Sequence, residues 1–258
     1  MHGEFLNATL VANDVNCDGL VLDPNCFTTL AFVALSEEGE RTFSFARKPG
    51  ADTQLRPEEL RRDVIENSRV FHVGSLSLTD EPARSATIAA LDVAKTAGAV
   101  MSYDPNYRDS LWTSAEVASE QMRSIVTYMD LIKISCEETE LLTGRSDPTE
   151  AARILLGQGA QVVCVTLDDE GALVATKDGN ATVPSFKVDA VDTTGAGDSF
   201  WGGFLCAFVD ADIRPENVTL DDARSFARFG NAVASLCVRR RGAIPAMPTL
   251  DEVEKVLS

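Results

Sequence analysis

From residue 56 onward, short apolar runs alternate with longer amphipathic runs. The apolar runs are nearly continuous, which is typical of parallel strands covered by helices on both faces. We expect such strands at residues 70–73, 99–103, 131–134, 162–167, 171–176 and 181–187. Helices are expected at residues 57–67, 81–97, 114–129, 137–142, 149–156, 198–208 and 221–238. The pattern predicts an α/β protein with a mostly parallel sheet, whose ligands bind beyond the carboxyl ends of the strands.

The first fifty residues differ, because they indicate β structure. Residues 28–35 are rich in β-branched and apolar side chains, residues 37–40 form a turn signal, and residues 41–46 alternate polar and apolar side chains. This arrangement predicts a hairpin with one solvated face.

Composition excludes several classes of protein. The 258 residues include 23 Lys and Arg and 40 Asp and Glu, so the formal net charge is 23 − 40 = −17. This charge repels nucleic acid and anionic lipid, and we expect no nucleic-acid or membrane partner. The six cysteines are scattered without a Cys-x-x-Cys pair, which favours buried free thiols and a cytoplasmic location. Two histidines leave little room for a histidine zinc site or a Ser-His-Asp hydrolase.

The segment from Val191 to Phe200, VDTTGAGDSF, carries the strongest chemical signal. Its glycines allow a tight turn and a close approach of the backbone to a ligand. The turn opens a helix, whose first N–H groups and dipole together form an anion site. Asp198 then stands at the mouth of that site, where a carboxylate can accept the proton of a hydroxyl that attacks a phosphoryl group.

Other interpretations of this segment were weighed. Phe200 occupies the third glycine position of a dinucleotide fingerprint, and no Gly-Lys pair of a P-loop occurs in the chain. Gly197-Asp198-Ser199 is similar to the GDS-type lipases, but no histidine follows His72 to serve as a base. A purely structural glycine turn, with an acid favoured by the helix dipole, stays open on these ten residues alone.

The segment DTTGAGD at residues 192–198 resembles the C-terminal signature of the ribokinase-like (pfkB-type) carbohydrate kinases, and within them the chain is most similar to fructokinases. Further motifs of that kind extend over nearly the whole chain: TTLAFV at 28–33, RKPGAD at 47–52, GSLSL at 74–78, SYDPNYR at 102–108, LW at 111–112, KISCEE at 133–138 and RGAIPAMP at 241–248. The resemblance implies a three-layer α/β/α ribokinase-like fold with a small β lid.

The resemblance also implies how the chain is organised. Residues 1–258 would form a single kinase domain, with the lid as an excursion at about 18–50. The family normally opens with a strand, an Asp-containing sugar-binding segment and a Gly-Gly motif that this sequence lacks, so we expect an N-terminally incomplete domain. Lids of the family often form a dimer contact, which makes a homodimer an expectation as well.

The resemblance assigns roles residue by residue. Asp198 would be the catalytic base, and Gly195, Ala196 and Gly197 would supply the anion hole. The implied contacts with ATP come from Ser135, Thr166, Asp168, Gly171 and Asn231. The implied contacts with substrate come from Asp104, Asn106 and Arg108. Glu138 would orient water on Mg²⁺, and a K⁺ loop would contain Asp192, Thr194 and Gly242, with backbone near Cys237, Arg240 and Ala246.

Structural alternatives stand beside several of these roles. Glu138 could simply be an acid in the first turn of a helix, and Asn231 a polar residue between helical turns. The loop from Asp104 to Arg108 could be an ordinary turn with a surface arginine. Asp168 departs from the family, which has glycine there, and adds a carboxylate close to the expected phosphates.

The function implied is ATP-dependent phosphorylation of a sugar hydroxyl, with fructose as the first candidate. The alternatives are 2-keto-3-deoxygluconate kinase or another pfkB-type kinase. From a different class, a non-catalytic remnant that binds nucleotide or self-associates also stays open, because the opening sugar-binding strand is missing.

Overall fold

The computed structural model describes residues 1–35 and 41–258, with the backbone alone for residues 33–35 and 41–43. Clustering of contacts divides the chain into two compact units. The first contains Met1–Met101 and Asn106–Ser124, and the second contains Ser102–Pro105 and Ile125–Ser258. The prediction that residues 1–258 form a single domain stays a prediction.

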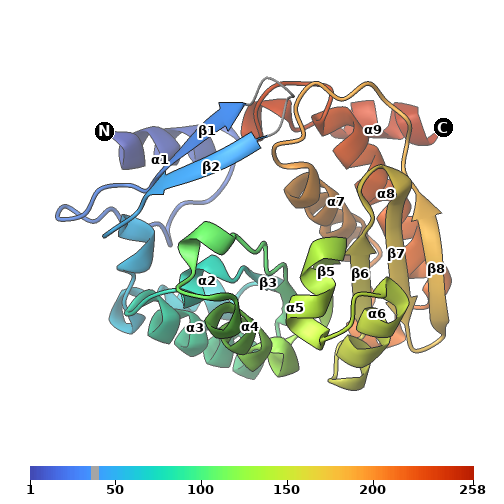
Figure 1. Cartoon of the computed structure of the whole chain (residues 1–258), viewed down its shortest axis with the longest axis horizontal. Helices are drawn as coiled ribbons and strands as arrows, with labels where there is room; N and C mark the ends of the chain where they lie inside the picture. Colours follow the sequence, from blue (N-terminus) through green and yellow to red (C-terminus); the bar gives the residue numbers. More distant parts are fainter. Residues whose placement is uncertain (36–40) are drawn as a thin grey trace. The chain divides into compact units, whose positions relative to one another are not determined.

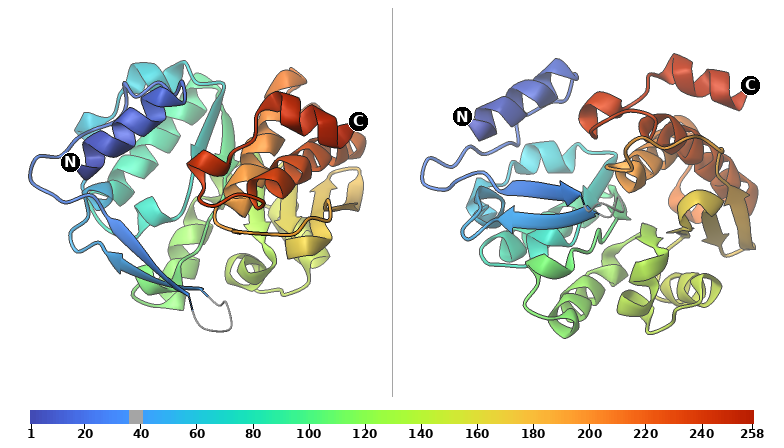
Figure 2. Two further views of the ribbon diagram at one scale, coloured as in Figure 1. Left: turned by 90° about the horizontal axis from the view of Figure 1, so that it is seen from above. Right: turned by 45° about the horizontal axis from the view of Figure 1, so that its top comes forward.

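The first unit begins with α1 (His2–Ala12), so the expectation of β structure is wrong for the first twelve residues, and it continues into the predicted hairpin. Strands β1 (Leu30–Leu35) and β2 (Arg41–Ala46) pair antiparallel, with Leu30 opposite Ala46, as the two blue arrows of Figure 2 show. They form a two-stranded sheet apart from the central one. The hairpin is therefore confirmed, while its turn at residues 37–40 lies outside the described part of the chain.

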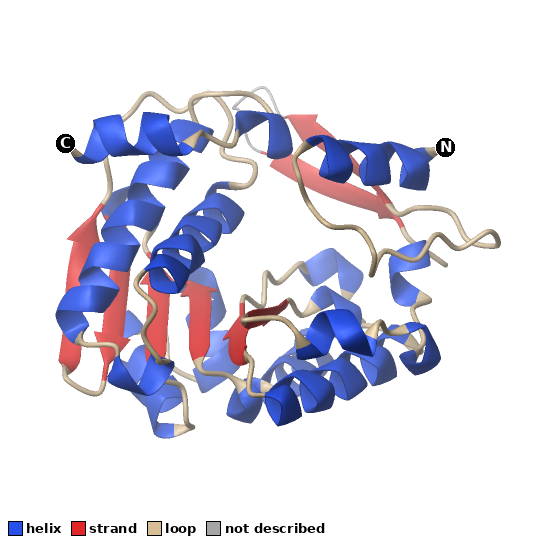
Figure 3. Ribbon diagram, turned by 180° about the vertical axis from the view of Figure 1, so that it is seen from behind, coloured by secondary structure: helices blue, strands red, loops and turns tan. Residues whose placement is uncertain are grey.

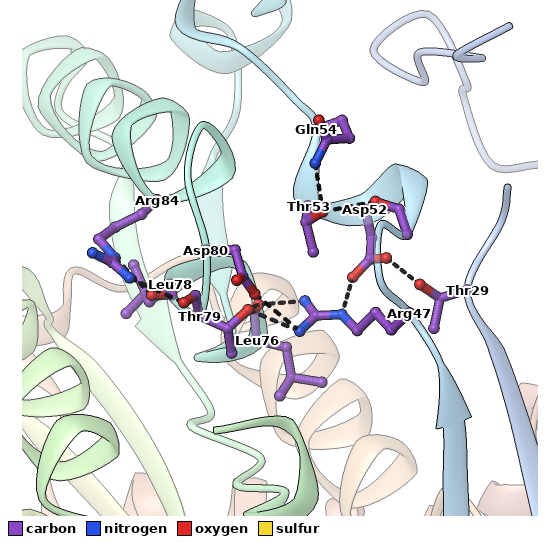
Figure 4. A network of polar contacts seen from close by, with 11 residues as sticks. Thr29, Arg47, Asp52, Thr53, Gln54, Leu76, Leu78, Thr79, Asp80 and Arg84 are labelled. Atoms are coloured by element: carbon purple, nitrogen blue, oxygen red, sulfur yellow. Dashed lines mark hydrogen bonds and ion pairs between the residues drawn. The ribbon is translucent and has the colours of Figure 1, made fainter. Parts of the chain in front are cut away.

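Arg47 anchors the end of this hairpin, as Figure 4 shows. Its buried guanidinium donates to Asp52 Oδ2 at 2.7 Å, to Thr79 Oγ1 at 2.8 Å and to the carbonyl oxygen of Leu76 at 2.7 Å. Asp52 also accepts a hydrogen bond from Thr29 on the approach to β1. The network joins β2 to the segment after strand β3 (Val70–Val73) within the same unit.

The remaining helices of the first unit are α2 (Arg62–Glu66), α3 (Ala83–Ala97) and α4 (Ala115–Ser124). Helix α3 ends before Gly98, a C-cap residue with a left-handed φ of 81°, so it ends where the helix predicted at 81–97 ends. The helix expected at 57–67 is instead divided, because extended backbone at Leu60 separates a 3₁₀ turn (Pro57–Glu59) from α2.

The central sheet has the order β3-β4-β5-β6-β7-β8 (Figure 1). Beyond β3, its strands are β4 (Val100–Tyr103), β5 (Leu131–Ser135), β6 (Val162–Thr166), β7 (Gly171–Thr176) and β8 (Gly179–Pro184). Strand β5 runs parallel to both β4 and β6, whereas β7 pairs antiparallel with β6 and β8. Parallel β4, β5 and β6 therefore bring their carboxyl ends to one edge, as predicted.

Helices of the second unit cover both faces of its strands (Figure 3). They are α5 (Thr139–Thr143), α6 (Pro148–Gly157), α7 (Ala196–Asp210), α8 (Leu220–Cys237) and α9 (Leu250–Leu257). Strand β7 contacts both α6 and α8 and is buried along its whole length. Helix α8 begins with a capping box of Thr219 and Asp222, and α9 lies outside the predicted helices.

Among the helices of residues 1–35 and 41–258, none has both the length and the apolar character needed to cross a membrane.

Candidate active site

The predicted anion site lies at the beginning of α7. Gly195 is the N-cap residue with a φ of 78°, and Ala196, Gly197 and Asp198 form the first turn. No side chain caps this turn, and in the described part of the chain the N–H groups of Gly197 and Asp198 have no hydrogen-bond acceptor. Asp198 is exposed, so the turn presents unpaired donors together with an accessible carboxylate.

Packing within the second unit holds α7 in place. The indole Nε1 of Trp201 donates to Ser102 Oγ of β4 at 2.9 Å. Its ring stacks on Phe204 with centroids 4.8 Å apart, and Phe204 meets Phe226 of α8 edge to face at 5.6 Å. Because these aromatic contacts lie one to two turns beyond Asp198, the first turn of α7 has a fixed position against the strands.

Asp104 follows the carboxyl end of β4 and is buried. Its Oδ2 accepts a hydrogen bond from Lys133 Nζ of β5 at 2.9 Å. Burial raises the pKa of Asp104 to about 6; Lys133 lowers it, and the charges of Glu138 and Asp198 raise it further. The structure therefore brings Asp104, Lys133, Glu138 and Asp198 together at the carboxyl ends of β4 and β5.

Ser135 and Glu138 form a local capping arrangement after β5. The backbone N–H of Ser135 donates to Glu138 Oε2 at 2.7 Å, across the 3₁₀ turn Cys136–Glu138. Glu138 is buried, although it carries a charge. The structural alternative thus accounts for one carboxylate oxygen of Glu138, and its predicted role beside Mg²⁺ stays a prediction.

Thr166, Asp168 and Gly171 lie around the turn from β6 to β7. Thr166 Oγ1 donates to the carbonyl oxygen of Ile134 at 3.4 Å. Exposed Asp168 has a φ of 50°, a left-handed conformation that explains why glycine suits this position in the family. At Gly171 the φ is 111°, and a Cβ would lie 2.2 Å from the carbonyl oxygen of Val183, so the packing of β7 against β8 by itself requires this glycine.

Asn231 is buried in α8, and its side chain ties this helix to β8. Its Nδ2 donates to the carbonyl oxygens of Val183 at 3.0 Å and Pro184 at 3.1 Å. The amide therefore has a structural use, and its predicted place in an adenine site stays a prediction.

The residues of the predicted K⁺ loop do come together. Asp192 accepts hydrogen bonds from the N–H of Thr194 through Oδ1 and from the N–H of Gly242 through Oδ2, both at 2.9 Å. The N–H groups of Val191 and Asp192 both donate to the carbonyl oxygen of Val238. These bonds hold the irregular segment before α7 against the segment after α8.

Asn106 and Arg108 belong to the first unit and are partly exposed. Asn106 has a φ of 48°, and the Nη1 of Arg108 donates to the carbonyl oxygen of Tyr107 at 2.8 Å. Their predicted contact with substrate stays a prediction.

Lys133 is the residue of this site that sequence reasoning missed. It stands inside the apolar run Leu131-Ile132-Lys133-Ile134, and only 5% of its surface is exposed. A single lysine within an otherwise apolar strand is the signal that could have found it, because a buried charge requires a partner.

Three similar proteins place the chain among known kinases. It is 45% identical over 260 residues to probable fructokinase-4 of Arabidopsis thaliana, covering 99% of this chain and 78% of that protein. A fructokinase of Vibrio cholerae O395, solved with fructose, ADP and calcium ion, superposes with a TM-score of 0.90 at 32% identity, covering 99% of this chain and 82% of that one. A fructokinase of Xylella fastidiosa with bound ATP superposes with a TM-score of 0.89 at 34% identity, covering 98% of this chain and 80% of that one.

A family model agrees with these relatives. The model described as pfkB family carbohydrate kinase matches residues 1–250, which include all the site residues discussed above. This chain belongs to the pfkB family of carbohydrate kinases.

Proposed function

We propose that this protein is an ATP-dependent fructokinase, which converts fructose and ATP to fructose 6-phosphate and ADP. The observation that carries the proposal is the first turn of α7, where exposed Asp198 stands beside the unpaired N–H groups of Gly197 and Asp198. The fructose-bound and ATP-bound fructokinases of similar structure support the choice of both substrates.

In this proposal Asp198 acts as the general base. Its carboxylate accepts the proton of the sugar hydroxyl while the hydroxyl oxygen attacks the γ-phosphorus, and the bond from that phosphorus to the β,γ-bridging oxygen breaks to release ADP. Gly195, Ala196 and Gly197 shape the turn whose N–H groups and helix dipole stabilise the negative charge on the transferred group.

ATP would lie along the carboxyl ends of β5 and β6. We assign Ser135, Thr166, Asp168 and Gly171 to its phosphate side and Asn231 to the adenine side. The described residues hold no cluster of three or more potential metal ligands. Mg²⁺ keeps several waters and binds mainly through substrate phosphates, and Glu138 would orient one of those waters. The cation would neutralise charge on the phosphates.

The sugar would contact Asn106 and Arg108, with Asp104 at the same loop. An amide can hydrogen-bond sugar hydroxyls, and a guanidinium can clamp an anionic product. In the K⁺ loop, Asp192 supplies one carboxylate, and Thr194 and Gly242 supply backbone oxygens; hard oxygen donors of this kind suit an alkali cation.

Two further assignments accompany the proposal. The lid hairpin offers a surface for a homodimer, because the side chain of Phe32 is 58% exposed on β1. The six cysteines are free thiols, which supports a cytoplasmic location. The expectation that they are buried is correct for Cys164 and Cys237 and wrong for Cys136 and Cys206, which are exposed.

The test is ATP-dependent phosphorylation of four acceptors: fructose, 2-keto-3-deoxygluconate, ribose and adenosine. We expect fructose to give the highest kcat/KM. Asp198→Asn should lower kcat by about 10³- to 10⁴-fold, because it removes the base at unchanged volume. Asp251→Asn is the matched control, since Asp251 is also an exposed acid in the first turn of a helix and should have no effect.

Each contrary result has a definite meaning. Highest kcat/KM for 2-keto-3-deoxygluconate or ribose would replace the substrate and keep the kinase. Binding of ATP without turnover of any acceptor would reject the kinase in favour of a non-catalytic nucleotide-binding protein. More than half of the wild-type kcat in Asp198→Asn would reject Asp198 as the base.

A further inference from the structure

The ion pair of Lys133 and Asp104 is buried below the first turn of α7. The Lys133 side chain is 7% exposed and the Asp104 side chain 5%, and Nζ lies 2.9 Å from Oδ2. Lys133 comes from β5, and Asp104 directly follows β4, the strand that pairs parallel with β5. Lys133 therefore lies on a strand, and Asp104 is the first residue after one.

Stability alone gives little reason to keep such a pair. Taking two charges out of water costs several kcal/mol per ion, and apolar residues of similar volume in place of a buried pair are often neutral or stabilising. The neighbours of Lys133 along β5, which are Ile132 and Ile134, are fully buried apolar residues. A third apolar side chain would suit the strand. The charge of Lys133 is therefore explained better by a role in function than by stability.

The ammonium lies directly against the anion hole. A Cβ placed on Gly197 would be 2.9 Å from Lys133 Nζ, so glycine at this position leaves the room that the ammonium occupies. Gly197 also carries one of the two N–H groups that have no acceptor in the described part of the chain. The positive charge of Lys133 and the positive end of α7 therefore meet at one residue.

The donors of Lys133 are not all used. An ammonium has three N–H donors, and within the described residues Asp104 is its one hydrogen-bond acceptor. Glu138 and Asp198 add negative charge to the same cluster. Without the ammonium, a site built from three carboxylates would repel the phosphates of a nucleotide.

We propose that Lys133, held by Asp104, is a further positioning residue of phosphoryl transfer, which sets the Gly197 turn and places a positive charge beneath the transferred phosphoryl group. The inference rests on the proposed kinase function. Lys133 gains and loses no proton in the reaction; it acts through the charge it holds and the position it imposes on Gly197.

The test compares four forms of the full chain: the wild type, Lys133→Met, the double variant Lys133→Met with Asp104→Leu, and the control Lys255→Met on exposed α9. We expect Lys133→Met to lower kcat by about 10²-fold with KM for fructose changed less than about threefold. The double variant should recover thermal stability, because it leaves no buried unpaired charge, but it should keep the low kcat. Lys255→Met should match the wild type.

A second readout does not require turnover. The ammonium of Lys133 faces the site of the transferred group, which ATP carries and ADP lacks. Lys133→Met should therefore weaken the binding of ATP by about tenfold and the binding of ADP by less than about threefold. Titration calorimetry measures both affinities. This result can appear even where none of the four acceptors is phosphorylated, so failure of the proposed fructokinase activity is distinguishable from failure of this inference.

Two results would overturn the inference. One is recovery of kcat together with stability in the double variant, because the pair would then only support the fold. The other is an equal change, or no change, in the affinities for ATP and ADP in Lys133→Met.

Discussion

Each unit of the molecule contains a buried cation beside an aspartate, and the two pairs differ in how far the protein satisfies the cation. In the first unit, Arg47 donates to Asp52, Thr79 and Leu76, so its guanidinium is engaged from several directions. In the second, Lys133 donates to Asp104 alone among the described residues and lies against a helix N-terminus. A cation held by three different groups supports structure, whereas one held by a single carboxylate beside a helix N-terminus is suited to act on a ligand.

The largest stability effect should come from Arg47→Ala. The change leaves the carbonyl of Leu76, Thr79 and Asp52 without their cation, and we expect a loss of about 3 to 4 kcal/mol in the free energy of unfolding. Below the unfolding temperature, kcat should stay within about threefold of the wild type. Urea denaturation and steady-state kinetics check both results. Arg61→Ala, which breaks an exposed pair with Asp63, should change the free energy of unfolding far less. A large loss of kcat at full folding would remove the contrast between the two pairs.

The next effect is the pH dependence of stability at Asp104. Burial raises the pKa of this carboxyl to about 6, compared with 3.8 for an unperturbed aspartate, so between these values the native state binds a proton that the unfolded chain releases. The Asp104 carboxyl therefore stabilises the fold at low pH. Its contribution to the free energy of unfolding falls by at most about 3 kcal/mol as the pH rises from the unfolded pKa through the folded one. The unfolding free energy of the wild type should fall relative to Asp104→Asn between pH 4 and about 6.5, since asparagine does not titrate. Parallel curves over this range would contradict the raised pKa.

Gly197→Ala should affect turnover more than stability. Its Cβ would lie 2.9 Å from Lys133 Nζ and displace the ammonium, so we expect kcat to fall about tenfold with a small change in melting temperature. Gly202→Ala in the same helix is the matched control, because nothing lies within 4 Å of its Cβ. That control should be neutral or slightly stabilising. Equal kinetics in both variants would contradict a functional link between Lys133 and the anion hole.

The smallest effect should come from Asp52→Asn. Asp52 is 46% exposed, and the asparagine can still accept from Arg47, so we expect a loss of about 1 kcal/mol in unfolding free energy with unchanged kcat. A loss as large as that of Arg47→Ala would mean that the charge of Asp52, and not the set of hydrogen bonds, maintains the anchor.

Local signals predicted much of the fold. The strand predicted at 70–73 and the end of the helix before Gly98 are confirmed, because hydrophobic periodicity and helix capping depend on neighbouring residues. The predicted helix at 57–67 was too long. Nothing in the local sequence distinguishes a 3₁₀ turn that ends in extended backbone at Leu60 from a first helical turn. The candidate site was predicted where glycines and an acid open a helix, and it was incomplete where partners come from elsewhere.

The sequence by itself determined the α/β pattern, the hairpin and the turn from Gly195 to Asp198, because each depends on residues close together in the chain. Only the tertiary structure decided that Lys133 lies under Gly197 and pairs with Asp104, 29 residues away. It also decided that Gly171 is required by Val183 and that Asn231 serves β8. The physical reason is that burial, charge compensation and close backbone approach depend on which strands and helices become neighbours, and no local period records that.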